Sequence, residues 1–510
     1  MQADVIVIGS GIGGLTAAAL LARYGKSVIV CESHAIPGGA AHGFSRQGFL
    51  FDSGPSFFAG LSDSNSLNPL RQVLEAIGET VAAVPYEPFG YYHFPEGTFA
   101  VYGNSDRYKA EIAKVTLQGA QEYTKFEREL LRLYDRLRQI PAMALRADFN
   151  LIPFLLSRYP AALLNLLPQL AIIQASVGNV ARVFVHDRWV QRLIDLECFL
   201  LSGLKADGTV APEMAFMLGE RTHSAIDYPI GGSDALVQAL IRGLERWGGT
   251  LRLNAHVEQI LVERGRVSGV QLRRGEVLHA PIVISNATIW DTYTQLLKPT
   301  DLPPAYRQRS LNIPVVDSFM HLHLGIRADG LNALTGHHVV VHDAAQDITV
   351  PGNTCMISIP SVWDAKLAPP GHHVVHAYTL EPFAGWQRDE HYDARKRDRS
   401  QSLYRALERI IPDVRQRIVL ELIGTPLTHA HYLRRHQGTY GPAIAAGKGM
   451  FPSTHTPIAG LYRVGDSTIP GIGVPAVAAS GILCANTIVS PQQVAALLKQ
   501  SFNSQKILEN

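Results

Sequence analysis

Two short apolar runs, with a small-residue stretch between them, open the chain. Val5–Ile8 predicts a strand, Leu15–Tyr24 a helix and Lys26–Cys31 a second strand. Neither run shows polar alternation, which is typical of a parallel sheet covered on both faces. The pattern therefore predicts a buried strand–helix–strand unit at the start of the chain.

A comparable pattern closes the chain, where Leu461–Gly465 is strand-like and Val474–Ile488 has the apolar spacing of a helix. In the middle, residues 251–287 contain three or four short strands broken by ERGR and RRGE turns. We expect these strands to form a meander packed against the first unit. Ile282–Ser285 is expected to return to the main sheet.

These separated patterns predict an α/β fold with two interwoven domains. One is a Rossmann-type dinucleotide-binding domain, made of a parallel sheet plus a β-meander. The other is a mixed α+β substrate domain. The expected segments are 1–60, 225–300 and 440–495 for the first domain, 61–224 and 301–439 for the second, and 496–510 for a tail without catalytic signal.

Residues 151–176 form the oiliest stretch of the chain. Pro153, Pro160 and Pro168 interrupt it, and Arg158 lies inside it. A regular transmembrane helix does not tolerate prolines at this density. Three interpretations remain: buried core helices, an apolar surface that docks on a membrane, or the mouth of a lipid channel.

Composition narrows the class of protein. Hydrophobic residues make up 46% and charged residues 18%, against about 25% charged in typical proteins. The net charge of +2 excludes a bulk field that would attract nucleic acid. The four cysteines have no CxxC spacing, which predicts reduced, buried thiols in a cytosol-like compartment. No leader and no apolar run of about 18–20 residues is recognisable, so we expect a chain made without a leader, or a mature form.

The turn after the first predicted strand carries the first chemical signal. Gly9, Gly11 and Gly14 form G-x-G-x-x-G between a strand and a helix, with Glu32 at the end of the next strand. Such glycines permit a tight turn, close approach of the backbone to a pyrophosphate and close helix–strand packing, while the acid accepts ribose hydroxyls. The spacing predicts a dinucleotide site.

The residues after Glu32 decide between NAD and FAD. Gly38 and Gly39 follow six residues later, and Phe51–Pro55 reads FDSGP. A second glycine pair lets another loop cross close to a pyrophosphate–ribityl chain, which a nicotinamide site does not need. The pattern favours FAD.

The closing motif favours the same cofactor. Gly465 and Asp466 lie at the terminus of the last predicted strand, and an aspartate there can bind ribityl hydroxyls. Gly471 and Gly473 open the last helix, so its free N–H groups at Gly473 and Val474 can face the flavin edge that becomes negative on reduction. We therefore expect FAD.

Taken together, the opening fingerprint, Glu32 with its glycine pair, the FDSGP loop, Tyr228–Gly232 (YPIGG) and the closing GDST–PGIGVPAVAASG run resemble the carotenoid isomerase and bacterial-type phytoene desaturase family. The likeness covers nearly the whole chain and is nearest to the carotenoid isomerase branch. It implies a flavoprotein of the monoamine-oxidase-like fold that acts on a long polyene at a membrane surface.

The resemblance also implies roles for single residues. Gly11, Gly13 and Gly14 would face the pyrophosphate, Glu32 would bind the adenosine ribose, and the backbone of Val257 would contact the adenine region.

For the flavin half, the resemblance implies that Asp466 holds the ribityl chain and that Ile230–Gly232 lies near the isoalloxazine. Desaturation and cis–trans isomerisation of the polyene both stay open, since the flavin carries the redox chemistry.

No catalytic residue is predicted. The histidines, among them His321 and His323 on one strand face, are expected to be surface or hydrogen-bonded core residues rather than metal ligands. Glu220, Arg221 and Asp227 either reach a face of the flavin as acid–base groups or, the interpretation we favour, form a solvated helix end. Two aromatic stretches, Tyr91–Phe94 and Phe57–Phe58, either line a polyene tunnel or pack as ordinary strands.

Two alternative functions are kept. One is an amine or quinone-type oxidase of the same fold. The other is an escort protein that binds prenylated partners without flavin, which the intact flavin motifs disfavour. The expected partners are a hydrophobic polyene, a membrane surface bound peripherally on the cytoplasmic or plastid-stromal side, and a quinone electron acceptor.

Overall fold

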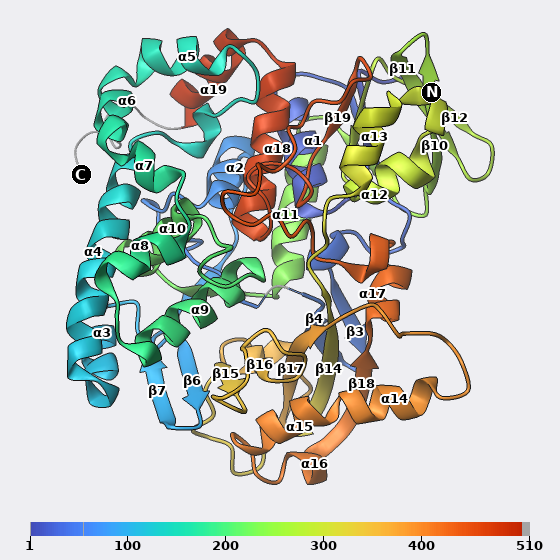
Figure 1. The fold of residues 1–510 in the computed structure, drawn as a ribbon. Coiled ribbons are helices and arrows are strands. Elements are labelled where there is room, and N and C mark those ends of the chain that lie inside the picture. The colour runs from blue at the N-terminus through green and yellow to red at the C-terminus, as the bar shows by residue number, and fades with distance from the viewer. Residues whose placement is uncertain (1, 55, 502–510) are drawn as a thin grey trace.

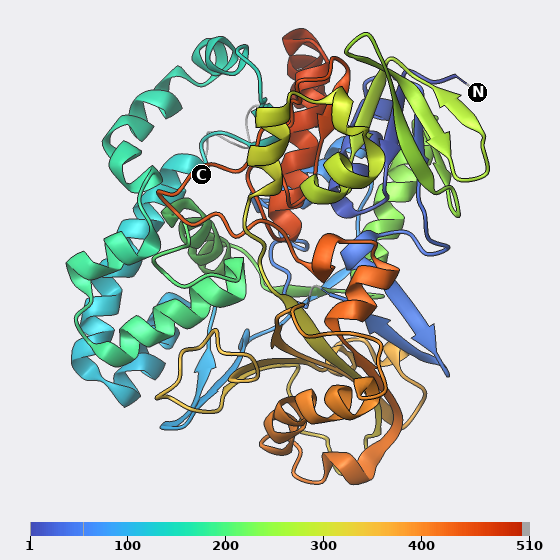
Figure 2. The ribbon, with the colours of Figure 1, turned by 45° about the vertical axis from the view of Figure 1, so that its right-hand side comes forward.

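The structure, a computed structural model, describes residues 2–54 and 56–501. Figure 1 shows three neighbouring regions: a parallel sheet with its covering helices at the top, a helical region at the left, and a second sheet at the bottom. A turn of the view separates the helical region from the helices of the parallel sheet (Figure 2).

The first sheet is parallel throughout and takes its strands from distant parts of the chain. Its order is β19-β13-β1-β2-β9, with Val5 opposite both Ile282 and Val28. The strands are β1 (Val5–Ile8), β2 (Val28–Cys31), β9 (Thr250–Arg252), β13 (Ile282–Ser285) and β19 (Leu461–Arg463).

Two layers bury the two faces of this sheet, which explains why its strands are apolar at every position. Val5 and Val7 pack on helices, whereas Ile6 and Ile8 pack on the meander. The helices are α1 (Ile12–Arg23), α2 (Pro69–Ile77), α11 (Ser233–Arg246) and α18 (Val474–Ile488), and the meander is β10 (Val257–Glu263), β11 (Arg266–Leu272) and β12 (Val277–His279).

The predicted core of the fold is confirmed, with shifted boundaries. The meander packs on the first unit and β13 returns to the main sheet. The first helix begins at Ile12 rather than Leu15, because Gly13 and Gly14 already belong to its first turn. The second strand begins at Val28 rather than Lys26, and β9 joins the parallel sheet instead of the meander.

The second sheet has seven strands in the order β18-β14-β17-β16-β15-β6-β7, antiparallel except where β15 meets β6. Alternation along β14 sends Met320 and Leu322 to helices α14–α16 and His321 and His323 to the opposite face. The elements are β6 (Gly90–Phe94), β7 (Gly97–Val101), β14 (Ser318–Arg327), β15 (His337–Val341), β16 (Thr354–Ser358), β17 (His372–Glu381), β18 (Ile418–Gly424), α14 (Tyr392–Arg399), α15 (Gln401–Glu408) and α16 (Val414–Arg417).

The third region is helical, and smaller elements connect the regions. Its helices are α3 (Ser105–Val115), α4 (Leu117–Leu137), α5 (Leu151–Arg158), α6 (Pro160–Leu166), α7 (Leu170–Ile173), α8 (Val177–Phe184), α9 (Arg188–Ser202) and α10 (Ala211–His223). The remaining elements are β3 (Gly43–Arg46), β4 (Phe49–Asp52), β5 (Ala83–Pro85), β8 (Asp227–Pro229), α12 (Ile289–Asp291), α13 (Pro304–Leu311), α17 (Pro426–Tyr432) and α19 (Pro491–Ser501).

Helices α5 to α7 correct one interpretation of the oily stretch. Their large apolar side chains point outward, so the interpretation as buried core helices is wrong for most of this segment. Within the described residues no single helix is long and apolar enough to cross a membrane. One bent pair, Leu151–Arg158 with Pro160–Ile173 at 109°, has the length and composition. The exposed side chains are Phe149, Ile152, Leu156, Leu164, Leu167 and Leu170.

The chain end also differs from expectation. Residues 496–501, predicted as tail, form the second half of α19, and its Val494, Leu497 and Leu498 are buried. Residues 502–510 lie outside the described residues. The four cysteines are free and buried, as predicted. The division into domains stays a prediction.

Candidate functional site

A cavity of about 960 Å³ begins at the carboxyl edge of the parallel sheet. The residues that follow four strands line it: Gly9 after β1, Glu32 after β2, Asn286 after β13 and Gly465 after β19. Open α/β sheets bind ligands in the crevice outside these strand ends. The cavity then continues between the helical region and the seven-stranded sheet.

The glycine turn forms one wall of this cavity. Gly9, Gly11 and Gly13 line it, whereas Gly14 is absent from the described lining. A side-chain carbon at Gly14 would lie 2.4 Å from the carbonyl oxygen of Gly9. The structure thus places Gly14 in the contact of helix with strand, the role its spacing indicates, and away from the cavity.

Glu32 lies at the end of β2 and is 7% exposed. Its Oε2 accepts from the backbone N (2.9 Å) and Oγ (2.7 Å) of Ser10, and its Oε1 accepts from the backbone N of His34 (2.8 Å). Ser10 also receives the N–H of Gly38 on its carbonyl oxygen at 3.1 Å. One serine therefore ties the acid to the second glycine loop, where Gly38 and Gly39 also line the cavity.

The sequence did not identify Ser10 or Asn286 as site residues. Ser10 is the first variable position of the fingerprint. Asn286 donates its backbone N–H to Ile8 at 2.9 Å and lines the cavity. Its position directly after the predicted strand Ile282–Ser285 was the signal that could have found it.

Two helix N-termini face the cavity, those of α1 and α18. No described side chain caps either one. Gly473, the N-cap of α18, has φ +103, and a side-chain carbon there would meet nothing within 4 Å, so the space before Gly473 and Val474 is open. Unpaired N–H groups and the helix dipole favour negative charge. These residues fit a dinucleotide whose diphosphate and reduced flavin ring are anionic.

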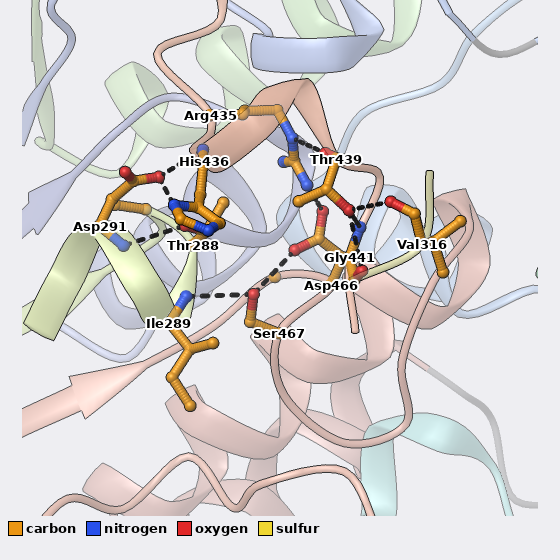
Figure 3. A network of polar contacts seen from close by, with 12 residues as sticks. Thr288, Ile289, Asp291, Val316, Arg435, His436, Thr439, Gly441, Asp466 and Ser467 are labelled. Carbon is orange, nitrogen blue, oxygen red and sulfur yellow. Dashed lines mark hydrogen bonds and ion pairs between the residues drawn. The ribbon is translucent and has the colours of Figure 1, made fainter. Parts of the chain in front are cut away.

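Asp466 follows β19 and its side chain is 15% exposed at the cavity wall. Its Oδ2 accepts from Arg435, and its Oδ1 accepts from the Oγ of Ser467 at 3.2 Å (Figure 3). Carboxylates in this arrangement can still accept further hydrogen bonds from a ligand.

Val257 lies at the opposite end of the dinucleotide part of the cavity, beside His256 and Arg273. Its side chain packs in the core under the sheet, with Ile260. Its backbone is therefore the part available to a ligand, in line with the role that the resemblance implies.

The YPIGG element lies behind this wall rather than on it. Asp52 of the FDSGP loop accepts from the Oη of Tyr228 (2.7 Å) and the backbone N of Ser233 (2.7 Å). Ile230–Gly232 are absent from the described cavity lining, so a place beside the isoalloxazine is not what the geometry favours. Pro55 of the loop lies outside the described residues.

The far part of the cavity, which we call the apolar arm, is lined by aromatic side chains from several elements. Of the predicted run Tyr91–Phe94 only Tyr92 lines it: Tyr91 and His93 point to the opposite face of the strand, and Phe94, on the same face as Tyr92, packs against Phe99 and Trp189 instead. Both members of Phe57–Phe58 line it. The aromatic lining includes Phe57, Phe58, Tyr92, Phe199, Phe319 and Tyr378.

Two of the charged residues named from the sequence, Glu220 and Arg221, line the apolar arm, whereas Asp227 is absent from the described lining. The prediction of a solvated helix end at Glu220, Arg221 and Asp227 is wrong, since they are 2%, 5% and 0% exposed. Helix α4 covers α10 there: a side-chain carbon at Gly219 would overlap the ring of Tyr134.

The two charges in the arm, Glu220 and Arg221, have partners. Arg221 donates to Glu197 at 2.8 Å. Glu220 accepts from Ser66 (2.5 Å), Tyr134 (2.8 Å) and the backbone N of Leu67 (3.0 Å). Burial raises the pKa of the Glu220 carboxyl above its usual value. The arm therefore contains a fixed polar cluster within apolar walls.

The buried histidines form a stack behind the arm. His321 and His376 share a hydrogen bond of 2.8 Å with rings 14° apart, and His323 stacks on His376 at 4.3 Å and 7°. Ligand atoms of the three lie within 4.8 Å of one another. A metal needs lone pairs that converge on one point, and nearly parallel rings do not provide this. Burial lowers the pKa of His323 to about 4.

The chain is similar to known flavoproteins. Residues 12–489 match a family described as flavin containing amine oxidoreductase. The chain is 36% identical over 498 residues to a prolycopene isomerase of Daucus carota, covering 96% of this chain and 80% of the relative. A neurosporene-forming phytoene desaturase of Rhodobacter capsulatus is 28% identical over 517 residues, covering 95% and 93%.

A solved structure has the same fold. An oxidoreductase from Methanosarcina mazei superposes with a TM-score of 0.60 at 21% identity, covering 94% of this chain and 99% of that one. The predicted fold class, cofactor and family are thus confirmed. The chain belongs to the flavin-containing amine oxidoreductases, in the group of the carotenoid isomerases and phytoene desaturases, and is an FAD-dependent enzyme.

Proposed function

We propose that this enzyme isomerises a long carotenoid-type polyene from cis to trans in a reaction at its flavin. The observation that carries the proposal is one continuous cavity, of which one end fits a dinucleotide and the other end is an aromatic, apolar arm. The name and 36% identity of the Daucus carota relative support isomerisation over desaturation.

The cofactor contacts belong to the same proposal. Gly9, Gly11 and Gly13 would accommodate the pyrophosphate, Glu32 the adenosine ribose and the Val257 backbone the adenine. For the other half, Asp466 would bind the ribityl hydroxyls. Gly38, Gly39, Gly465, Gly473 and Val474 would enclose the chain and ring, and Gly14 would act through helix packing.

In this proposal the chain positions and isolates the substrate. Bound FAD supplies reversible electron or hydride exchange with the polyene. The faces of Phe57, Phe319 and Tyr378 complement a flat conjugated chain, and apolar walls exclude water. Desaturation would also release a proton. Three donors engage Glu220 and Arg221 pairs with Glu197, but Oε2 of Glu197 accepts from none of the described residues, so these carboxylates do not decide between the two reactions.

We propose further that α5 to α7 dock on a membrane. Leu164 and Leu167 are 66% and 57% exposed on the bent helix pair, and Phe149, just before the pair begins, is 93% exposed. Apolar side chains gathered in this way insert at the headgroup boundary. The membrane would be reached from the cytoplasm or, as the chloroplastic names of the relatives suggest, the plastid stroma.

Liposome flotation tests the membrane proposal. Replacing Leu164 and Leu167 together by Glu should release most of the protein from the vesicles. Val183→Glu, at an equally exposed apolar position on α8 (65%), should leave flotation unchanged. Equal flotation of the two variants would contradict the proposal.

Product analysis tests the reaction. Flavin-loaded protein is given a poly-cis lycopene or phytoene in liposomes, either with oxidised flavin and a quinone or with anaerobically reduced flavin. An all-trans product under reducing conditions supports isomerisation. New conjugated bonds under oxidising conditions would identify a desaturase with a quinone acceptor. No product from either polyene would move the proposal to the amine or quinone oxidase alternative.

A further inference from the structure

The segment 425–441 crosses the cavity between the seven-stranded sheet and the dinucleotide end. It comprises α17 and the turns after it, and Ala430–Arg435 line the cavity. Its end is held in place because the N–H of Val316 donates to the Gly441 carbonyl at 2.8 Å. The segment is therefore part of the cofactor wall.

Arg435 connects this segment to the aspartate expected at the ribityl chain. Its Nε donates to the carbonyl oxygen of Thr439 at 2.6 Å, and its Nη2 donates to Oδ2 of Asp466 (Figure 3). Both charged side chains are 15% exposed. A charge-assisted bond in a partly buried place fixes the orientation of a carboxylate better than a neutral one.

A second set of contacts, made by the neighbouring residue His436, fixes the backbone at Arg435. The N–H of His436 donates to Oδ2 of Asp291 at 2.8 Å, and the His436 ring stacks on Trp290 at 5.2 Å and 20°. Ser467 connects these two sets of contacts: its Oγ accepts from the N–H of Ile289 at 3.2 Å and donates to Asp466. Figure 3 shows the hydrogen bonds of this network.

We propose that Arg435 is a positioning residue for the cofactor. It holds the Asp466 carboxylate in one orientation, so that the oxygens of Asp466 can accept from ribityl hydroxyls. Retention of FAD then depends on the position of the 425–441 segment, which carries Arg435. A carboxylate already fixed loses less conformational freedom when the ligand binds. The proposal concerns FAD retention, so it stands or fails separately from the polyene reaction.

The alternative is that Arg435 contacts the cofactor by itself, since it also lines the cavity. A double-mutant cycle separates the two. The release of FAD from the full-length holoenzyme is followed by the recovery of flavin fluorescence after dilution. The variants are Arg435→Gln, Arg435→Lys, Asp466→Asn and the double variant Arg435→Gln/Asp466→Asn.

Arg435→Gln should speed FAD release about tenfold, the size expected for loss of a hydrogen bond to a charged group. Arg435→Lys keeps a positive charge beside the Asp466 carboxylate. It should therefore restore most of the FAD retention. The double variant should release FAD no faster than Asp466→Asn alone. Additive losses, no rescue by Lys, or unchanged release in Arg435→Gln would each overturn the proposal.

Two further variants keep the test decisive. Arg395→Gln removes a similar arginine, which donates to the Gly385 carbonyl and to Asp389 far from the cavity, and should not change FAD release. If Arg435→Gln does not fold, Ser467→Ala removes the other contact to Asp466. It should speed release about threefold in a stably folded protein, and unchanged release would count against the proposal.

Discussion

The two ends of the cavity are built by different means. At the dinucleotide end the wall is mostly backbone: the turn at Gly9–Gly13, the open N-terminus at Gly473 and two carboxylates, Glu32 and Asp466, fixed by neighbouring donors. At the apolar arm the wall is side chains from α9, α10, β6, β14 and β17, with one buried ion pair, Glu197–Arg221.

This difference assigns separate roles to the two ends. Backbone N–H groups and strand ends bind features that every dinucleotide shares, so under the proposed function we expect the first end to set cofactor affinity. The arm has few fixed polar groups and many exchangeable apolar ones, so under the same proposal we expect it to set which substrate fits. Mutations at one end should leave the property of the other end unchanged.

The largest expected effect is at the dinucleotide carboxylates. Glu32→Ala and Asp466→Ala should each give a folded, largely flavin-free and inactive protein, because each removes a charged acceptor worth about 1.5–3 kcal/mol. The ratio of flavin to protein absorbance, with circular dichroism for the fold, measures this. Normal flavin loading in both variants would remove the expected site.

The second-largest effect is expected from Gly14, where helix α1 packs closely against the turn after β1. Gly14→Ala places a carbon 2.4 Å from the Gly9 carbonyl oxygen, so strand and helix must separate, at a cost of about 1–3 kcal/mol in unfolding free energy and with loss of flavin. Gly424→Ala, whose nearest contact is 3.4 Å, is the matched control in thermal unfolding. Equal stability of the two variants would show that the close approach is unimportant.

A smaller effect is expected from the histidine stack behind the arm. The pKa of His323 is lowered to about 4 by burial, so between about 6.5 and 4 the unfolded chain binds a proton that the folded one does not. Stability should therefore fall as pH falls through this window, with up to about 1.4 kcal/mol per pH unit from this residue.

His323→Asn should reduce the slope of unfolding free energy against pH, measured by urea unfolding. Asparagine at the exposed His391 should leave the slope unchanged. An unchanged slope in His323→Asn would mean that the stack takes up protons in the folded state.

The smallest expected effect is on substrate binding. The ring of Phe57 lines the arm, and its centroid lies 4.9 Å from that of Phe89 and 4.4 Å from that of His337. Phe57→Leu should raise KM for the polyene about threefold to tenfold with normal flavin content. Tyr91→Leu, on the non-lining side of β6, is the control. Flavin loss in Phe57→Leu would contradict the separation of the two ends.

The same difference explains what could be predicted from the sequence. Backbone-built sites need glycines and acids at set distances from strand ends, and so Gly9, Glu32, Asp466 and Gly473 could be named. Arg435 could not, because its partner lies 31 positions away in the chain and its loop carries no such spacing.

The arm left no comparable signal. Glu197 and Arg221 meet only because α9 and α10 are brought together, and a charge at a helix end is solvated unless another helix covers it. The cover over Arg221 comes from α4, whose Tyr123 accepts from it at 3.1 Å. Helix packing of this kind is set by tertiary contacts that the local sequence does not show.

The most direct test of the central claim is a count of electrons against product. Holoenzyme is reduced once, anaerobically, mixed with an excess of poly-cis lycopene, and the all-trans product is measured against enzyme flavin. An isomerase with no net redox change should form product in more than about tenfold excess over flavin, without further reductant. Product limited to the electrons supplied, or an oxidised product with extra double bonds, would contradict it.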